Sequence, residues 1–371
     1  MNKVNLLALL LLATPLACET MGPPLSPPPP PPGPPAETAV VAPPPPPAEP
    51  PKPPEPTPEE KKKAEEDKKK AEAAERMAAA RAKWEADSKL EAARWTSEMH
   101  AAVKALVAAK YPNLKAELTA VLKSGHRKPT SAARDVYRHP LETLEFFGLT
   151  PTMTVLEFGP GEGWYTEVLA PVLAAKGKLL VTINDPNGPP DSGATFAGQR
   201  FKRFLDTGPE AYGKVETVVV GGPVPKLGME GKLDMVILAR ELHGLHNNKL
   251  LPGVLAEIFK ALKPGGILGV EQHRAPEGAN PDESAKKGYL PEKWVIAQAE
   301  AVGFKLAGKS EINANPKDTK DYAEGVWTLP PTYELKDKDR QKYADIGESD
   351  RMTLKFVKPS KAAKPAKPKI R

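Results

Sequence analysis

The chain has 371 residues, a formal net charge of +6 and a single cysteine, Cys18. A lone cysteine excludes a disulfide within one chain, so the fold must depend on its apolar core. Much of the positive charge lies in the tail after residue 357, which is basic, interrupted by proline and predicted to be disordered over residues 358–371. The charge is therefore poor evidence for nucleic-acid binding, and no nucleic-acid partner is expected.

Residues 1–17 predict a signal peptide. A short charged start is followed by a Leu/Ala-rich run that is too short to span a bilayer comfortably, and then by small residues. The sequence P-L-A-C at residues 15–18 resembles a lipoprotein processing site. We expect lipidation at Cys18, and acyl chains there would anchor the protein stably. The chain is thus predicted to lie in the bacterial cell envelope, on the periplasmic side and lipid-anchored; the alternative is an ordinary cleavage site with an incidental cysteine.

Two segments of biased composition follow. Residues 18–58 are rich in proline and predict an extended linker. Residues 59–95 consist largely of Glu, Lys, Ala and Arg, which favours one charged helix, and leucine does not recur in the pattern of a coiled coil. Together they indicate a stalk between the membrane and a folded domain, unless both are disordered without a spacing role.

The remainder of the chain has the periodicity of a folded α/β domain. Apolar stripes in residues 96–150 predict a helical cap, and residues 151–357 then alternate strands with helices. This predicts a Rossmann-like, doubly wound and mostly parallel sheet, and the long connection before the final strand is compatible with that strand being antiparallel. No helix is expected between the last two strands. The predicted strands are 153–158, 178–184, 215–221, 233–239, 266–272, 304–312 and 350–357, and the predicted helices are 162–175, 195–206, 248–262 and 292–302.

A glycine-rich stretch follows the first predicted strand. Residues 155–170 read V-L-E-F-G-P-G-E-G-W-Y-T-E-V-L-A, so that a strand, a loop with three glycines and an amphipathic helix come in succession. A loop in this context indicates a nucleotide-type cofactor, with a tight turn as the alternative. The acid precedes the first glycine by two positions, whereas the dinucleotide fingerprint places it about 20 residues later. A dehydrogenase is therefore disfavoured.

The pattern E-x-G-x-G-x-G resembles motif I of the class I S-adenosylmethionine-dependent methyltransferases. The resemblance covers about residues 130–357 and is nearest to the predicted methyltransferases of bacterial envelopes. It implies S-adenosylmethionine as the cofactor, with the loop around its methionine part and an antiparallel last strand. The matching stretches are A-R-D-V-Y-R-H-P (133–140), G-W-Y-T-E (163–167), L-K-P-G-G (262–266), S-E-I-N-A-N-P-K-D-T (310–319), G-V-W-T-L-P-P (325–331) and S-D-R-M-T-L-K-F (349–356).

The resemblance assigns cofactor binding to the first two strand ends. Glu157 would accept hydrogen bonds near the amino group of the cofactor or order the loop, and the Asp185 carboxylate can accept both hydroxyls of a ribose. The third strand is followed by no acid to hold the adenine, so we expect backbone groups around Gly221 and Gly222 to do so. The predicted cofactor-binding residues are Glu157, Gly159, Gly161, Gly163 and Asp185.

The acceptor site is expected at the ends of the fourth and fifth strands. His243 and His273 are the candidate catalytic bases, because histidine can accept a proton at neutral pH; packing or helix capping is the alternative. Arg240 and Arg274 would bind an anionic acceptor, with structural pairing to Glu271 as the alternative for Arg274, and Tyr137 would line a lid. No metal is predicted, since the chain lacks a zinc-ligand pattern.

Two functions fit these observations. The first is an exported, membrane-tethered S-adenosylmethionine-dependent methyltransferase that acts on a small molecule or an envelope polymer. The second is a non-catalytic envelope lipoprotein that binds another small ligand with the same fold. Intact glycines and Asp185 favour the first function. Export away from the cytoplasm, where the cofactor is made, and the missing acid after the third strand favour the second.

Overall fold

The computed structural model describes residues 57–222, 224 and 226–360. The predicted signal peptide, Cys18 and all but two residues of the proline-rich linker lie outside the described residues, as does most of the basic tail. Chain contacts separate residues 1–59 from a unit that runs from Glu60 to the C-terminus. Within the described ranges, no helix is both long and apolar enough to cross a membrane.

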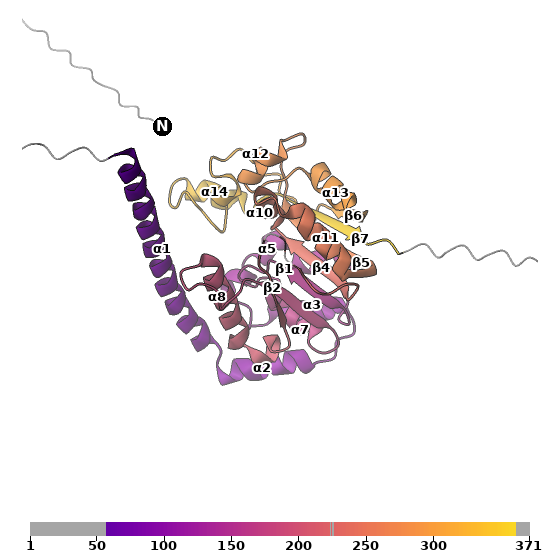
Figure 1. Ribbon diagram of the computed structural model, residues 1–371. Helices are drawn as coiled ribbons and strands as arrows, with labels where there is room; N and C mark the ends of the chain where they lie inside the picture. The colour runs from indigo at the N-terminus through magenta and orange to yellow at the C-terminus, as the bar shows by residue number, and fades with distance from the viewer. Residues whose placement is uncertain (1–56, 223, 225, 361–371) are drawn as a thin grey trace, which may run out of the picture. The chain divides into compact units, whose positions relative to one another are not determined.

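A seven-stranded sheet with the strand order β3-β2-β1-β4-β5-β7-β6 forms the centre of the unit (Figure 1). Strands β1 to β5 pair in parallel, and β7 runs antiparallel to both β5 and β6. The predicted Rossmann-like fold with an antiparallel last strand is thus confirmed. The strands are β1 (Thr154–Phe158), β2 (Lys178–Ile183), β3 (Glu216–Val219), β4 (Leu233–Ala239), β5 (Leu262–His273), β6 (Lys305–Ser310) and β7 (Arg351–Val357).

The sequence of each strand reflects its place in the sheet. Central strands β1 and β4 are almost continuously apolar and buried, because helices cover both faces of a parallel sheet. Edge strand β6 alternates exposed and half-buried residues, and β3 at the other edge is mostly exposed. The apolar run therefore predicts the central strands well and the edge strands only approximately.

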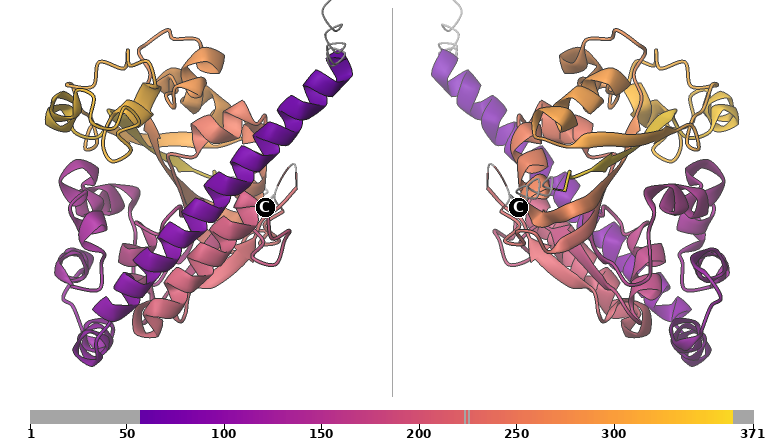
Figure 2. Two further views of the ribbon diagram at one scale, coloured as in Figure 1. Left: turned by 90° about the vertical axis from the view of Figure 1, so that its left-hand side faces the viewer. Right: turned by 90° about the vertical axis from the view of Figure 1, so that its right-hand side faces the viewer.

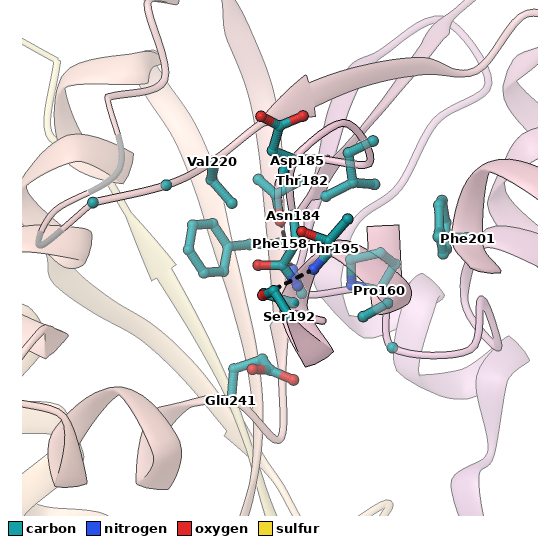
Figure 3. A pocket seen from close by; sticks show the side chains of 18 of the residues that line it. Phe158, Pro160, Thr182, Asn184, Asp185, Ser192, Thr195, Phe201, Val220 and Glu241 are labelled. Atoms are coloured by element: carbon teal, nitrogen blue, oxygen red, sulfur yellow. Dashed lines mark hydrogen bonds between the residues drawn. The ribbon is translucent and has the colours of Figure 1, made fainter. Parts of the chain in front are cut away.

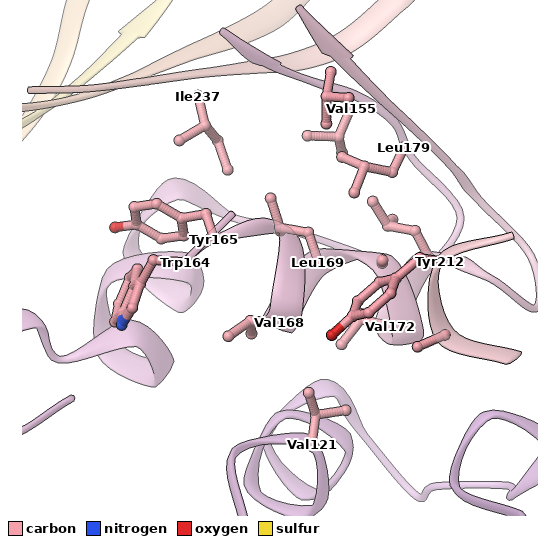
Figure 4. Packing of buried hydrophobic residues seen from close by; sticks show 14 of the residues in the cluster. Val121, Val155, Trp164, Tyr165, Val168, Leu169, Val172, Leu179, Tyr212 and Ile237 are labelled. Carbon is pink, nitrogen blue, oxygen red and sulfur yellow. The ribbon is translucent and has the colours of Figure 1, made fainter. Parts of the chain in front are cut away.

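One face of the sheet carries two layers of helices. All eight residues of α7 are buried, because this helix lies between the sheet and α3 (Figure 4). Figure 4 shows Val168 and Val172 of α7 between the strand residue Val155 and Val121 of α3. The helices of this face are α2 (Ser97–Ala108), α3 (Leu114–Lys123), α6 (Pro140–Phe147), α7 (Thr166–Leu173), α8 (Gly193–Thr207) and α9 (Pro209–Tyr212), with the single turns α4 (Pro129–Ala132) and α5 (Asp135–Arg138) between α3 and α6.

The other face differs from the prediction in two places. The helix expected at 248–262 corresponds to α11, which begins only at Leu251 because Lys249 adopts a left-handed backbone conformation (φ 59°), and the separate helix α10 before it was not predicted. The expectation of no helix between the last two strands was wrong, since η1 and α14 lie there. Tyr343 of α14 packs in a cluster with Tyr322 and Leu329, so tertiary contacts stabilise a helix that its own composition does not favour. These elements are α10 (Leu242–Asn247), α11 (Leu251–Ala261), α12 (Pro281–Lys286), α13 (Glu292–Ala301), η1 (Gly325–Thr328) and α14 (Arg340–Ile346).

The charged segment after the linker forms one helix, α1 (Pro58–Arg94), whose second half contacts α8 (Figures 1 and 2). The Trp84 and Phe196 rings meet edge to face with centroids 5.5 Å apart. The guanidinium of Arg81 donates to the Pro190 carbonyl at 2.8 Å and stacks 4.4 Å from the centre of the Phe196 ring. The second half of α1 therefore belongs to the folded domain, which its composition did not indicate.

We predict that Trp84→Ala lowers the free energy of unfolding by about 1 kcal/mol, because it removes an aromatic pair and part of a helix interface. Urea denaturation followed by circular dichroism measures this change. Leu90→Ala on the same helix is the matched control, since Leu90 is 73% exposed and its loss should cost less than about 0.5 kcal/mol. Equal effects of the two substitutions would show that α1 does not stabilise the domain.

Candidate functional site

A cavity of about 650 Å³ opens at the carboxyl ends of the strands, beside the glycine-rich loop (Figure 3). Ligands of open α/β sheets bind at this edge, where the strand order reverses. Its wall comes from the segments after β1, β2, β3 and β4 and from the first turns of α8. The residues that line it are Phe158, Gly159, Pro160, Gly161, Thr182, Ile183, Asn184, Asp185, Gly188, Pro189, Ser192, Ala194, Thr195, Ala197, Phe201, Val220, Gly221, Gly222, Glu241, Leu245 and Leu250.

The three glycines of the loop have different surroundings. A Cβ at Gly159 would lie 2.6 Å from Cγ of Glu241, and a Cβ at Gly163 would lie 2.5 Å from the Phe204 ring. A Cβ at Gly161 would meet no described atom within 4 Å. Gly159 and Gly161 line the cavity, whereas Gly163 lies outside its wall and allows α8 to approach the loop. Of the three, Gly161 is therefore the glycine that leaves room for a ligand.

Glu157 contacts the start of the helix that follows the loop, and it does not line the cavity. Its carboxylate accepts a hydrogen bond of 2.6 Å from the hydroxyl of Thr166, the first residue of α7. Burial raises the pKa of Glu157 to about 7. Of its two predicted roles, the structure provides the contacts for ordering the loop.

Asp185 and the glycines after β3 lie where the sequence analysis expected them. One Asp185 oxygen accepts from the backbone N–H of Asn187 at 2.9 Å, which holds the carboxylate at the end of β2. Gly221 and Gly222 line the cavity, and a Cβ at either position would meet no described atom within 4 Å. Their backbone groups are accessible to a flat ligand.

Glu241 is a cavity residue that the sequence analysis missed. It lies two residues after the end of β4, and Figure 3 shows it at the opposite end of the cavity from Asp185. Burial raises the pKa of Glu241 to about 7, and the opposing attraction of Arg240 does not cancel this shift. Its position after an apolar strand, in the run A-R-E-L, is a pattern that could have predicted a site residue, but the prediction fell on the neighbouring Arg240.

The described lining residues include two carboxylates, Asp185 and Glu241, and no lysine, arginine or histidine. The side chains of this wall would therefore attract a positively charged ligand. No three His, Cys, Asp or Glu side chains among the residues described gather as metal ligands do.

Arg240 turns away from the cavity toward β5. Its guanidinium lies 3.3 Å from a carboxylate oxygen of Glu271, and Tyr165 donates to the other oxygen of Glu271 at 2.8 Å. Arg240 has a left-handed backbone conformation with φ 62°. The side chains of the consecutive residues Arg240 and Glu241 therefore point in different directions. Arg240 takes part in an ion network, and Glu241 lines the cavity.

The two predicted catalytic histidines lie close together. Their ring centroids are 5.8 Å apart, and the ring of Trp327 lies 5.9 Å from that of His243. The Gln272 amide approaches Nδ1 of His243 at 3.3 Å, and Ser349 Oγ lies 2.6 Å from Nδ1 of His273. Burial is the main cause that lowers the pKa of both rings. Both histidines are therefore neutral at pH 7, and neither lines the cavity.

Arg274 and Tyr137 lie apart from the cavity wall. Carboxylates of Asp350, Glu311 and Glu292 surround the Arg274 guanidinium at 2.6–3.3 Å. Arg274 lines a second cavity of about 340 Å³. The exposed Tyr137 ring faces Gly347, and its backbone carbonyl accepts from Arg351. The structure thus brings Arg240, His243 and His273 together and leaves Arg274 in a structural ion network.

No protein-family model matches the chain, and no curated protein matches it in sequence. Among solved structures, it is similar to a methyltransferase from Aquifex aeolicus, titled as dependent on S-adenosylmethionine, with 16% identity, a TM-score of 0.41, and coverage of 67% of this chain and 100% of that one. A similarly titled methyltransferase from Methanosarcina mazei has 13% identity and a TM-score of 0.38, covering 57% and 95%. The cyclase SpnF has 15% identity and a TM-score of 0.44, covering 63% and 84%.

We predict that Gly163→Ala destabilises the fold by about 2 kcal/mol or more, because the new methyl group would meet the Phe204 ring and the backbone would be strained. Gly161→Ala should cost only about 1 kcal/mol, from backbone strain alone. Denaturant unfolding measures both changes, with Gly221→Ala as an unstrained control. A larger loss for Gly161→Ala than for Gly163→Ala would contradict these assignments.

Proposed function

We propose that this chain is a methyltransferase that binds S-adenosylmethionine in the cavity beside the glycine-rich loop. The observation that carries the proposal is the electrostatic character of the wall, which pairs an open glycine loop with two carboxylates and no side-chain cation among its described residues. The sulfonium and ammonium groups of this cofactor are positive. A desolvated carboxylate gains most from a positive partner, so the half-buried Glu241 would gain more from this cofactor than the exposed Asp185.

Each part of the cofactor has a candidate partner. Asp185 would accept the ribose hydroxyls, and the backbone at Gly221 and Gly222 would contact the adenine in place of an acid. Gly161 leaves room above the loop, and Glu241 lies on the wall where it would stabilise positive charge. When bound, the cofactor supplies a methyl group that is electrophilic because it is attached to a sulfonium.

The protein contributes mainly position. The strand end at Arg240 and Glu241 borders both the cavity and the pair His243 and His273, so we expect the acceptor to bind at this strand end, against the cofactor. A neutral histidine can accept a proton from a hydroxyl or amine acceptor. His243 is the better candidate of the two, because Ser349 contacts the His273 ring at 2.6 Å whereas the Gln272 contact of His243 is the longer one, at 3.3 Å.

The proposed location follows from residues 1–18. A signal peptide and lipidation at Cys18 would place the enzyme on the periplasmic side of a bacterial envelope, where a small molecule or an envelope polymer would be the acceptor. The alternative, a non-catalytic lipoprotein that binds another ligand, is favoured by the absence of an acid after β3. A positively charged ligand other than this cofactor would satisfy the same wall.

We predict that S-adenosylmethionine binds with micromolar affinity and that binding strengthens as the pH rises. Burial raises the pKa of Glu241 to about 7, so the carboxylate is mostly protonated at lower pH and must lose its proton to pair with a cation. The ionised fraction should rise about eightfold between about pH 6 and about pH 7.5, and the affinity about fivefold, because the protonated form still binds weakly. Isothermal titration calorimetry on the full-length protein measures this dependence.

Two variants separate the causes. Glu241→Gln should weaken binding about tenfold near pH 7.5 and remove most of the pH dependence, since the titrating carboxylate is gone. Glu277→Gln, an exposed carboxylate remote from the cavity wall, is the matched control and should change neither. If the pH dependence persists in Glu241→Gln, a group other than Glu241 titrates. If the folded wild-type protein does not bind the cofactor, the proposed function is wrong.

A further inference from the structure

Next to the cavity lies a cluster of four arginines that share two buried carboxylates. Arg134, Arg138 and Arg351 all contact Glu348, whereas Arg240 and Arg351 contact Glu271. These contacts connect the segment before α5, the end of β4, strand β5 and the start of β7. The arginine cluster is defined here as Arg134, Arg138, Arg240 and Arg351, with Glu271 and Glu348.

The charges of the arginine cluster do not balance. Four guanidiniums face two carboxylates, and Glu241, the next acid, is only partly ionised at neutral pH because burial raises its pKa to about 7. Burial, with repulsion from Arg240 and Arg351, lowers the pKa of Arg134. Buried excess charge is costly unless a counter-ion is supplied. Burial disfavours the charge of Arg240, but the carboxylates of Glu271 and Glu348 outweigh it and raise the Arg240 pKa, so the shortage of negative charge lies at Arg134.

Two of the four guanidiniums are accessible and have N–H groups without a hydrogen-bond partner among the described residues. The side chains of Arg134 and Arg240 are 27% and 21% exposed, whereas those of Arg138 and Arg351 are 3% and 1% exposed. Arg134 reaches Glu348 through Nε at 2.6 Å, and Arg240 reaches Glu271 through Nη1 at 3.3 Å. Other N–H groups of both forks remain for a ligand, and Nη1 of Arg138 is buried with no hydrogen-bond partner among the residues described.

The position of the arginine cluster relates it to the cavity. Arg240 and Glu241 are consecutive, so the cluster and the cavity wall share the end of β4. His243 and His273 lie near the arginine cluster. Burial lowers the pKa of both rings, and the positive charge of Arg240 lowers it further. An anion held by Arg134 and Arg240 would thus lie near His273 and near the end of β4, which also borders the cavity. Arg274 is not part of this arrangement, because three carboxylates already surround it.

We infer that Arg134 and Arg240 bind an oxyanion, a carboxylate or a phosphate, of the methyl acceptor. The planar guanidinium fork matches such groups through paired hydrogen bonds. The assignment of this anion to the acceptor rests on the proposed function, whereas the presence of an anion site does not. The acceptor class is thus narrowed to molecules that carry an anionic group close to the atom that receives the methyl.

The test uses the full-length protein, with malonate as the probe for a carboxylate site and inorganic phosphate as the probe for a phosphate site. Thermal unfolding is followed while each probe is titrated to millimolar concentration, and chloride at equal ionic strength serves as the reference. We expect at least one probe to raise the unfolding temperature by several degrees in a saturable way, and the stronger probe identifies the oxyanion. Arg134→Gln and Arg240→Gln should weaken the response at least tenfold.

Controls keep the outcomes distinct. Arg203→Gln removes an equal charge from an exposed position on α8 and should leave the response intact. Arg134→Lys keeps the charge without the fork and should lose most of the response, which tests geometry even if Arg240→Gln unfolds. An equal response in Arg134→Gln and wild type, or no response in wild type beyond that to chloride, overturns this inference. Cofactor titration of the same samples reports separately on the proposed function, because neither Arg134 nor Arg240 lines the cavity.

Discussion

Buried ion pairing at the carboxyl edge of the sheet is the constraint on which this structure depends. Arg351 at the start of β7 contacts both Glu271 of β5 and Glu348, and Glu348 in turn contacts the arginines before and within α5. Each carboxylate is inaccessible, so loss of one partner would leave a charge buried without compensation. These pairs connect segments more than 200 residues apart in sequence and fix the edge at which any ligand must bind.

At the same edge, two adjacent residues belong to different electrostatic environments: Arg240 to the arginine cluster and Glu241 to the acidic cavity. The left-handed backbone at Arg240 places its side chain in the arginine cluster while Glu241 lines the cavity. Gly159 is required because Glu241 occupies the space that a Cβ there would need. The glycine loop and the end of β4 are thus coupled by close packing, and a substitution at Gly159 would displace the cavity carboxylate as well as strain the turn.

The sequence predicted those features that depend on local patterns. Apolar runs located the central strands, and the glycine spacing with Asp185 located the cavity, because strand ends in a parallel sheet meet at one edge. Patterns could not predict that α1 packs on α8, since a charged helix has no strong apolar stripe and the contact depends on Trp84 and the guanidinium of Arg81. Arg134 was missed for a related reason. It precedes α5 in sequence, and only the folded chain brings it to Glu348, 214 positions later.

The two environments suit a reaction between unlike charges. On the proposed function, the acidic cavity holds a positive cofactor and the arginine cluster holds the anionic group of the acceptor, and the two ligands meet at the end of β4. Transfer of a methyl group from a sulfonium to a nucleophile removes the positive charge on sulfur, so charge separation falls as the reaction proceeds. An enzyme gains from such a change only if its fixed charges favour the geometry of transfer over that of binding. Glu241, whose pKa burial raises to about 7 in the free protein, ionises when a positive cofactor pairs with it, so its charge mainly stabilises the bound cation and the rate of transfer must depend on how the acceptor is positioned.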